Sequence, residues 1–134
     1  MSKLRKIAVL ENLEHYLNFT KDFLIHEDCN EDVIGDLSLV IEELLVNIIS
    51  YSYPSNQKGY ADLELSKIDG KIIICVIDKG IPFNILNIKK PDLSASIEER
   101  SIGGVGIHLI KSYVDDIHYI RQDDENIVTL IKIL

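Results

Sequence analysis

The segment IEELLVNIISYSY, residues 41–53, places Glu43 and Asn47 within a largely apolar helical pattern. These two residues are four apart, so on an α-helix they lie one above the other on the same face. The helix predicted over residues 32–50 is apolar nearly all round, which is typical of a buried helix. Because burying an unpaired carboxylate is costly, we expect a polar group beside the pair.

A magnesium ion with a nucleotide would provide such a polar group. An amide oxygen is a suitable hard ligand for Mg²⁺, and a carboxylate can accept a proton from an attacking hydroxyl. Spacing alone, however, favours a simpler explanation, in which the glutamate pairs with a lysine or reaches solvent. The ExxxN pattern occurs by chance in many helices, so the pair needs support from other segments.

A second polar signal follows the apolar run IIICVI, residues 72–77, which predicts a buried strand ending at Asp78. A carboxylate in this position can accept a hydrogen bond from an exocyclic amine such as the adenine 6-amino group. Gly80 has no Cβ and would let a planar base approach the backbone, and Pro82 and Phe83 follow it. Taken alone, an ordinary Asp-Lys-Gly turn explains this segment better.

A third signal is the glycine-rich run GGVG, residues 103–106, before a short helix predicted over residues 107–114. Free N–H groups and the positive end of the helix dipole favour an anion such as a phosphate there. The run matches neither the GxxxxGK[ST] pattern nor the dinucleotide pattern GxGxxG. A hinge without a ligand explains it equally well when it is considered singly.

The remaining chain predicts an α+β fold, because hairpin-connected strands alternate with a few helices. Asp69-Gly70 indicates a tight turn between two of the strands. We expect a mixed, mainly antiparallel sheet with the helices on one face, and a long loop over residues 84–102. Strands are predicted over residues 3–10, 60–66, 71–77, 117–121 and 127–133, and helices over residues 12–26, 32–50 and 107–114.

Composition indicates one globular domain over residues 1–134, with 46% hydrophobic and 27% charged residues. The net charge of -8 gives no electrostatic basis for binding nucleic acid or anionic lipid. No apolar run is long enough to span a membrane, and the N-terminus lacks a signal-peptide core. Cys29 and Cys75 have no metal-ligand spacing and are expected to be reduced thiols. We therefore expect a cytoplasmic protein without nucleic-acid or membrane partners.

In their order and separation, the three signals resemble the N, G1 and G2 boxes of the GHKL ATPase superfamily. The segments IEELLVNIISYSY, VIDKGIPFN and RSIGGVGIHLIKSYVDDIHY are most similar to the anti-sigma factor regulatory serine/threonine protein kinases. The similarity extends from about Asp32 to the C-terminus. It implies a Bergerat-type two-layer α/β sandwich with three helices on one face of the sheet, and ATP and Mg²⁺ as cofactors.

Carried over residue by residue, the resemblance makes Glu43 the general base on a substrate serine hydroxyl. It makes Asn47 the magnesium ligand and Asp78 the residue that reads adenine. The loop over residues 84–102 becomes an ATP lid, in which Arg100 is a candidate phosphate or partner contact, although a solvated side chain is the simpler interpretation. The other candidate nucleotide contacts are Gly80, Pro82, Phe83, Gly103, Gly104, Val105 and Gly106.

The same resemblance implies a homodimeric kinase that phosphorylates an anti-sigma factor antagonist and, when free of it, sequesters a sigma factor. A nucleotide-dependent switch that binds a partner without phosphorylating it stays open as an alternative. The catalytic domain of a two-component histidine kinase is a weaker alternative, because we find no helical hairpin with a phosphoacceptor histidine. The chain departs from the family at Tyr51-Ser52, where His-Ala is often found, and we expect this change to alter the pocket wall.

Overall fold

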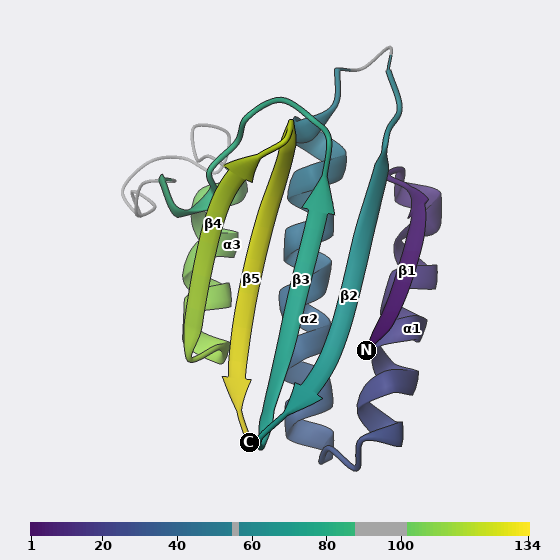
Figure 1. Ribbon diagram of the computed structural model, residues 1–134, viewed down its shortest axis with the longest axis vertical. Helices are drawn as coiled ribbons and strands as arrows, with labels where there is room; N and C mark the ends of the chain where they lie inside the picture. Colours follow the sequence, from purple (N-terminus) through teal and green to yellow (C-terminus); the bar gives the residue numbers. More distant parts are fainter. Residues whose placement is uncertain (55–56, 88–101) are drawn as a thin grey trace.

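The protein folds as a five-stranded sheet, in the order β1-β2-β3-β5-β4, with helices on one face (Figure 1). This computed structural model describes residues 1–54, 57–87 and 102–134, without the side chains of residues 102–105. The elements are β1 Ser2–Ile7, α1 Leu13–His26, α2 Glu31–Asn47, β2 Tyr60–Ile68, β3 Lys71–Asp78, α3 Ile102–Tyr113, β4 Asp116–Gln122 and β5 Glu125–Ile133.

The predicted α+β sandwich is confirmed, with α1, α2 and α3 on the same side of the sheet (Figure 1). Every strand pairing between the described residues is antiparallel, so no parallel pair contributes to this part of the sheet. No helix in the described ranges has both the length and the apolar character needed to cross a membrane.

The core lies between the sheet and α2, because alternate residues of the central strands point toward the helices. The stripe on α2 that faces them is apolar from Leu37 to Leu45 and ends at Asn47. α2 begins after Asn30, whose side-chain oxygen accepts a hydrogen bond from the Val33 N–H at 2.9 Å. The main buried contributors are Leu37, Val40, Ile41, Leu44 and Leu45 of α2 and Leu63, Leu65, Ile72, Ile74, Val76, Val128 and Leu130 of the sheet.

Two departures from the predicted helix boundaries concern the site. The predicted start of the last helix is wrong, because α3 begins at Ile102 and its first five residues include Gly103, Gly104 and Gly106. Glycine is about 1 kcal/mol less favourable than alanine in a helix, so the glycine-rich sequence predicts a later start for this helix. In addition, α2 continues into a π-helical turn over Ile48–Ser52, a wider form that is often found at functional sites.

Tyr16 of α1 connects the helix layer to the edge of the sheet through hydrogen bonds. Its side chain is fully buried, and its hydroxyl donates toward the carbonyl oxygens of Lys6 at 2.8 Å and Ala61 at 2.7 Å. The same oxygen accepts the Lys6 N–H at 3.1 Å. Burial raises the pKa of Tyr16 to about 12, so the hydroxyl stays protonated at neutral pH.

The substitution Tyr16→Phe is expected to lower the free energy of unfolding by about 1–3 kcal/mol, because it leaves buried carbonyl groups of β1 and β2 without their donor. Urea denaturation would measure the loss. Tyr60→Phe is the control, since 56% of Tyr60 is exposed. Equal stability of the two variants would contradict this account of the β1 edge.

Candidate functional site

The three sequence signals meet at one end of the sandwich, where α2 ends, β3 ends and α3 begins. A small pocket lies there, with a cavity volume of about 20 Å³, a mainly apolar wall and a few polar groups. Asn47 comes from α2 and Asp78 from β3, so residues 31 positions apart in the sequence share one pocket. The lining residues are Leu44, Asn47, Ile48, Ser52, Val76, Asp78, Phe83, Ile85, Asn126 and Val128.

Asn47 is almost fully buried, with 3% of its surface exposed. Its Nδ2 donates a hydrogen bond of 2.7 Å to the backbone oxygen of Glu43, which fixes the orientation of the amide. Within the part of the chain that the structure describes, its Oδ1 has no hydrogen-bond partner. A buried amide oxygen in this state is a good ligand for a hard cation, so the donor set fits Mg²⁺.

Glu43 lies one turn before Asn47 and is half-buried. Burial raises the pKa of its carboxyl, and the negative charge of Glu42 raises it further. Gly106 of α3 packs directly on this pair, because a Cβ built on it would collide with the Glu43 carboxylate and lie 3.7 Å from Asn47 Nδ2. A side chain at this position would therefore have to displace the end of the Glu43 side chain.

The sequence left open a lysine partner for Glu43. Among the described residues, the ion pairs involve β1, β2 and β4, and none of them includes Glu43.

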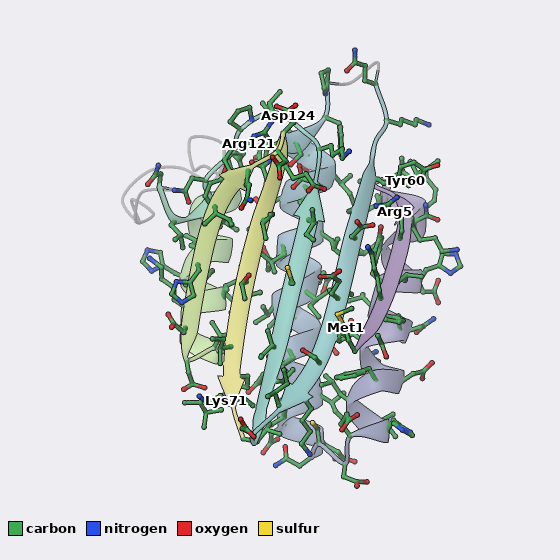
Figure 2. All side chains as sticks on the ribbon, in the orientation of Figure 1. Met1, Arg5, Tyr60, Lys71, Arg121 and Asp124 are labelled. Atoms are coloured by element: carbon green, nitrogen blue, oxygen red, sulfur yellow. The ribbon has the colours of Figure 1, made fainter. Side chains whose placement is uncertain are left out.

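Asp78 ends β3 with 4% of its surface exposed. Its Oδ1 accepts hydrogen bonds from the Gly80 N–H at 2.9 Å and from Asn126 Nδ2 at 3.0 Å. Burial raises the pKa of the carboxyl, while the hydrogen bonds from Asn126, Gly80 and Ser52 and the positive charge of Arg121 act in the opposite direction. Figure 2 shows Arg121 at this end of the sheet, and its Nη1 donates to the Gly80 oxygen at 2.8 Å.

Gly80 is required for the packing of the chain, rather than for contact with a ligand. A Cβ on this residue would collide with the carbonyl oxygen of Ser52, in the π-helical turn that follows α2. The next residue, Ile81, donates its N–H to the same Ser52 oxygen at 2.7 Å. The segment after β3 is thus held against the end of α2, and Gly80 is not among the residues that line the pocket.

The departure at Tyr51-Ser52 does shape the pocket wall. Tyr51 stacks on Phe83, with ring centroids 5.8 Å apart and planes inclined by 26°. Phe83 lines the pocket, so Tyr51 supports that wall from a position that is 37% exposed. Pro82, which precedes Phe83 in the chain, is exposed.

Asn126 of β5 is a site residue that the sequence reasoning missed. It is 2% exposed and donates to both Asp78 and the carbonyl oxygen of Ile81. A signal was present, because Asn126 alternates with Val128 and Leu130 and therefore stands on the buried face of its strand. A lone polar residue in a buried register position indicates a hydrogen-bonded role.

Several predicted contacts lie outside the described residues. These are Arg100 and most of the predicted ATP lid, of which the structure describes residues 84–87 and 102. For Gly103, Gly104 and Val105 the structure gives the helical backbone of α3 and no side-chain surroundings.

A sandwich with a partly apolar, partly anionic pocket at its strand ends is the arrangement expected of a ligand-binding domain. Residues 8–132 match the family described as histidine kinase-like ATPase domain, and the chain belongs to this family. The predicted superfamily is thereby confirmed, and membership implies ATP binding.

Sequence relatives and solved structures agree with this assignment. Serine-protein kinases RsbW from Bacillus thuringiensis and Bacillus cereus are 29% identical over 105 residues, or 75% of this chain. The chain covers 64% of the length of these relatives. A crystal structure of the RsbU and RsbW domains of a Mycobacterium tuberculosis protein contains this fold in part of its chain, with a TM-score of 0.66 and 15% identity over all of this chain and 33% of that one.

A blue-light activated histidine kinase from Erythrobacter litoralis also has this fold. Its histidine kinase domain matches 90% of this chain and 60% of its own length, with a TM-score of 0.54 and 16% identity.

Asp78→Asn is expected to leave the free energy of unfolding at pH 7 unchanged within about 0.5 kcal/mol, or to increase it. The folded state raises the pKa of Asp78, so its ionised form opposes folding above that pKa, and this cost disappears as pH falls through it. An amide removes the cost at every pH. Urea titrations at several pH values measure it, and a loss above about 2 kcal/mol would show that the carboxylate is structural.

Asp62→Asn is the matched control, because Asp62 is also a buried strand aspartate. The Arg5 guanidinium, at 2.6 and 2.8 Å, holds the pKa of Asp62 below its usual range. The ionised form therefore stabilises the fold at neutral pH, and this contribution is lost as pH falls through the lowered pKa. The control is expected to be less stable than the parent at pH 7, opposite to Asp78→Asn.

Proposed function

We propose that the protein is an ATP-dependent serine/threonine protein kinase with an anti-sigma role. In this proposal it phosphorylates an anti-sigma factor antagonist and, when free of it, sequesters a sigma factor. The observation that carries the proposal is the buried Asn47 beside Glu43, whose Oδ1 is unpaired among the described residues, in the pocket that contains Asp78. The homologous serine-protein kinases RsbW support it.

Asp78 would recognise the base in this mechanism. Its carboxylate would accept a hydrogen bond from the adenine 6-amino group, while the apolar wall around Val76 and Phe83 would cover the ring. The hydrogen bonds from Gly80 and Asn126 occupy Oδ1, so Oδ2 would contact the base, while the Ser52 side chain also hydrogen-bonds the carboxyl.

Asn47 would hold a magnesium ion through its Oδ1, since Nδ2 is already bound to the Glu43 carbonyl. When bound, the ion supplies charge neutralisation at the phosphate oxygens. The N–H groups at the start of α3 would contact the same phosphates through Gly103, Gly104, Val105 and Gly106. Arg100 stays a predicted phosphate or partner contact.

Glu43 would act as the general base. The substrate hydroxyl oxygen forms a bond to the γ-phosphorus, the bond from that phosphorus to the β–γ bridging oxygen breaks, and ADP leaves. The hydroxyl proton passes to the Glu43 carboxylate. Burial raises the pKa of this group, which makes it a better proton acceptor than an exposed glutamate.

We also propose that residues 1–134 act as one cytoplasmic domain and pair as a homodimer. What supports pairing is the sheet face opposite the helices, where β3 and β5 present isoleucines at 73, 77, 127 and 131 and no described helix covers them (Figure 1). A five-stranded face measures roughly 500–600 Å² from the usual strand spacing and rise. Two such faces would bury about 1,100 Å², near the lower limit for a specific interface.

For the kinase, Glu43→Gln is expected to lower phosphate transfer to a cognate antagonist by at least about 100-fold. ATP binding should stay within about threefold, because Glu43 does not line the base pocket. Labelled ATP measures transfer and calorimetry measures binding. Glu42→Gln, one residue away, is the control and should retain transfer. Full activity of Glu43→Gln would exclude Glu43 as the general base. ATP binding without phosphate transfer by the parent protein would favour the nucleotide-dependent switch that does not phosphorylate its partner.

For the dimer, the double variant Ile120→Lys, Ile133→Lys is expected to shift the mass in light scattering from dimer to monomer. These side chains are 50% and 56% exposed at the edge of the uncovered sheet face, so lysines there should fold normally but repel a second copy. Ile25→Lys, on α1 in the other layer and 60% exposed, is the control and should leave the mass unchanged. A monomeric parent protein would contradict the dimer.

A further inference from the structure

The side-chain amide of Asn126 is saturated with hydrogen bonds. Nδ2 donates to Asp78 Oδ1 at 3.0 Å and to the Ile81 carbonyl oxygen at 2.8 Å. Oδ1 accepts the Phe83 N–H at 3.2 Å and the Tyr119 hydroxyl at 2.6 Å. Both donors and both acceptor sites of the amide are therefore used.

This pattern fixes which atom of the amide faces Asp78. The Phe83 N–H can only donate, and the Ile81 carbonyl can only accept, so a flipped amide would place donor against donor and acceptor against acceptor. The Tyr119 hydroxyl on β4 holds the correct orientation from the far side. Asn126 thus joins β4, β5, the end of β3 and the segment that follows β3.

We propose that Asn126 is the positioning residue for base recognition, which holds the Asp78 carboxylate and the Gly80–Phe83 segment in one fixed arrangement. This inference rests on the proposed role of Asp78. Asn126 has no free donor or acceptor left for a ligand, so it acts through its two neighbours. By occupying Asp78 Oδ1, it leaves the second oxygen to face the adenine amine, and by holding the Phe83 N–H it sets the aromatic wall of the pocket.

The other polar and charged groups around the carboxylate do not duplicate this role. Arg121 donates to the Gly80 carbonyl, and Ser52 and Tyr53 approach from the turn after α2. Tyr53 uses its hydroxyl on the Lys79 N–H and the Tyr60 oxygen. Asn126 is the described side chain that contacts both the carboxylate and the backbone on either side of Pro82.

The test compares ATP with inosine triphosphate, which has an oxygen in place of the 6-amino group, by calorimetry with magnesium chloride. The parent protein should prefer ATP by about tenfold or more, the loss expected for a missing hydrogen bond to a charged group. Asn126→Asp, which is isosteric, places a second carboxylate against Asp78 and should reduce this preference to less than about threefold. A purely structural role would weaken both nucleotides equally and keep the ratio.

The double variant Asp78→Asn, Asn126→Asp exchanges the amide and the carboxylate. It should recover the melting temperature lost in Asn126→Asp, because the like-charge contact is gone, but not the preference for ATP. Tyr119→Phe, which removes one of the four hydrogen bonds, provides a folded variant if Asn126→Asp does not fold, and should reduce the ratio at least about twofold. Asn30→Asp is the control, since Asn30 uses only its oxygen at the start of α2 and an aspartate serves equally there.

The outcomes separate the two proposals. A parent protein without preference for ATP would overturn the role of Asp78. A parent preference that persists in Asn126→Asp, or in Tyr119→Phe where the former is unfolded, would overturn the positioning role of Asn126 and leave that of Asp78 intact.

Discussion

The burial of polar groups at one end of an apolar sandwich is the constraint on which the rest of this structure depends. Asp78 and Asn126 stand on the helix-facing side of the sheet, and Asn47 stands on the sheet-facing side of α2, all below 5% exposure. A buried polar atom is costly unless it is hydrogen-bonded. Asp78 and Asn126 satisfy each other, whereas Asn47 keeps an oxygen unpaired within the described residues. The paired Asp78 and Asn126 therefore stabilise the structure of the site, whereas the Asn47 oxygen is the group available to a ligand.

Much of the sandwich could be predicted from the sequence, because its signals are local. The alternation in β2, the apolar run in β3 and the turn at Asp69-Gly70, with φ of 51° and 75°, are encoded within a few residues. The start of α3 was misplaced for the opposite reason. The packing of Gly106 on Glu43 is a contact between segments about sixty residues apart, and it outweighs the low helix propensity of glycine.

The site was also predicted in part: the residues with local sequence signals were found, and the residue that depends on contacts between distant segments was missed. Glu43, Asn47 and Asp78 fall in spacings that a reader of the sequence can recognise. Asn126 does not, because its meaning comes from the Asp78 register across the β3–β5 pair and from Tyr119 on the next strand. Gly80 could be recognised as a special position, yet the reason for it, the Ser52 carbonyl, lies in another element.

The π-helical turn over Ile48–Ser52 has a geometric consequence for this end of the molecule. In a regular α-helix, residues five apart differ by about 140° around the axis, so Ser52 would point away from the Asn47 side. The wider turn, with its i to i+5 hydrogen-bond pattern, brings residues five apart to the same side of the helix axis. Asn47 and Ser52 therefore line the same pocket, one from each end of the turn. The turn thus accommodates one more residue than ordinary winding, in which the residue on the Asn47 side is the fourth after it, about 40° away around the axis.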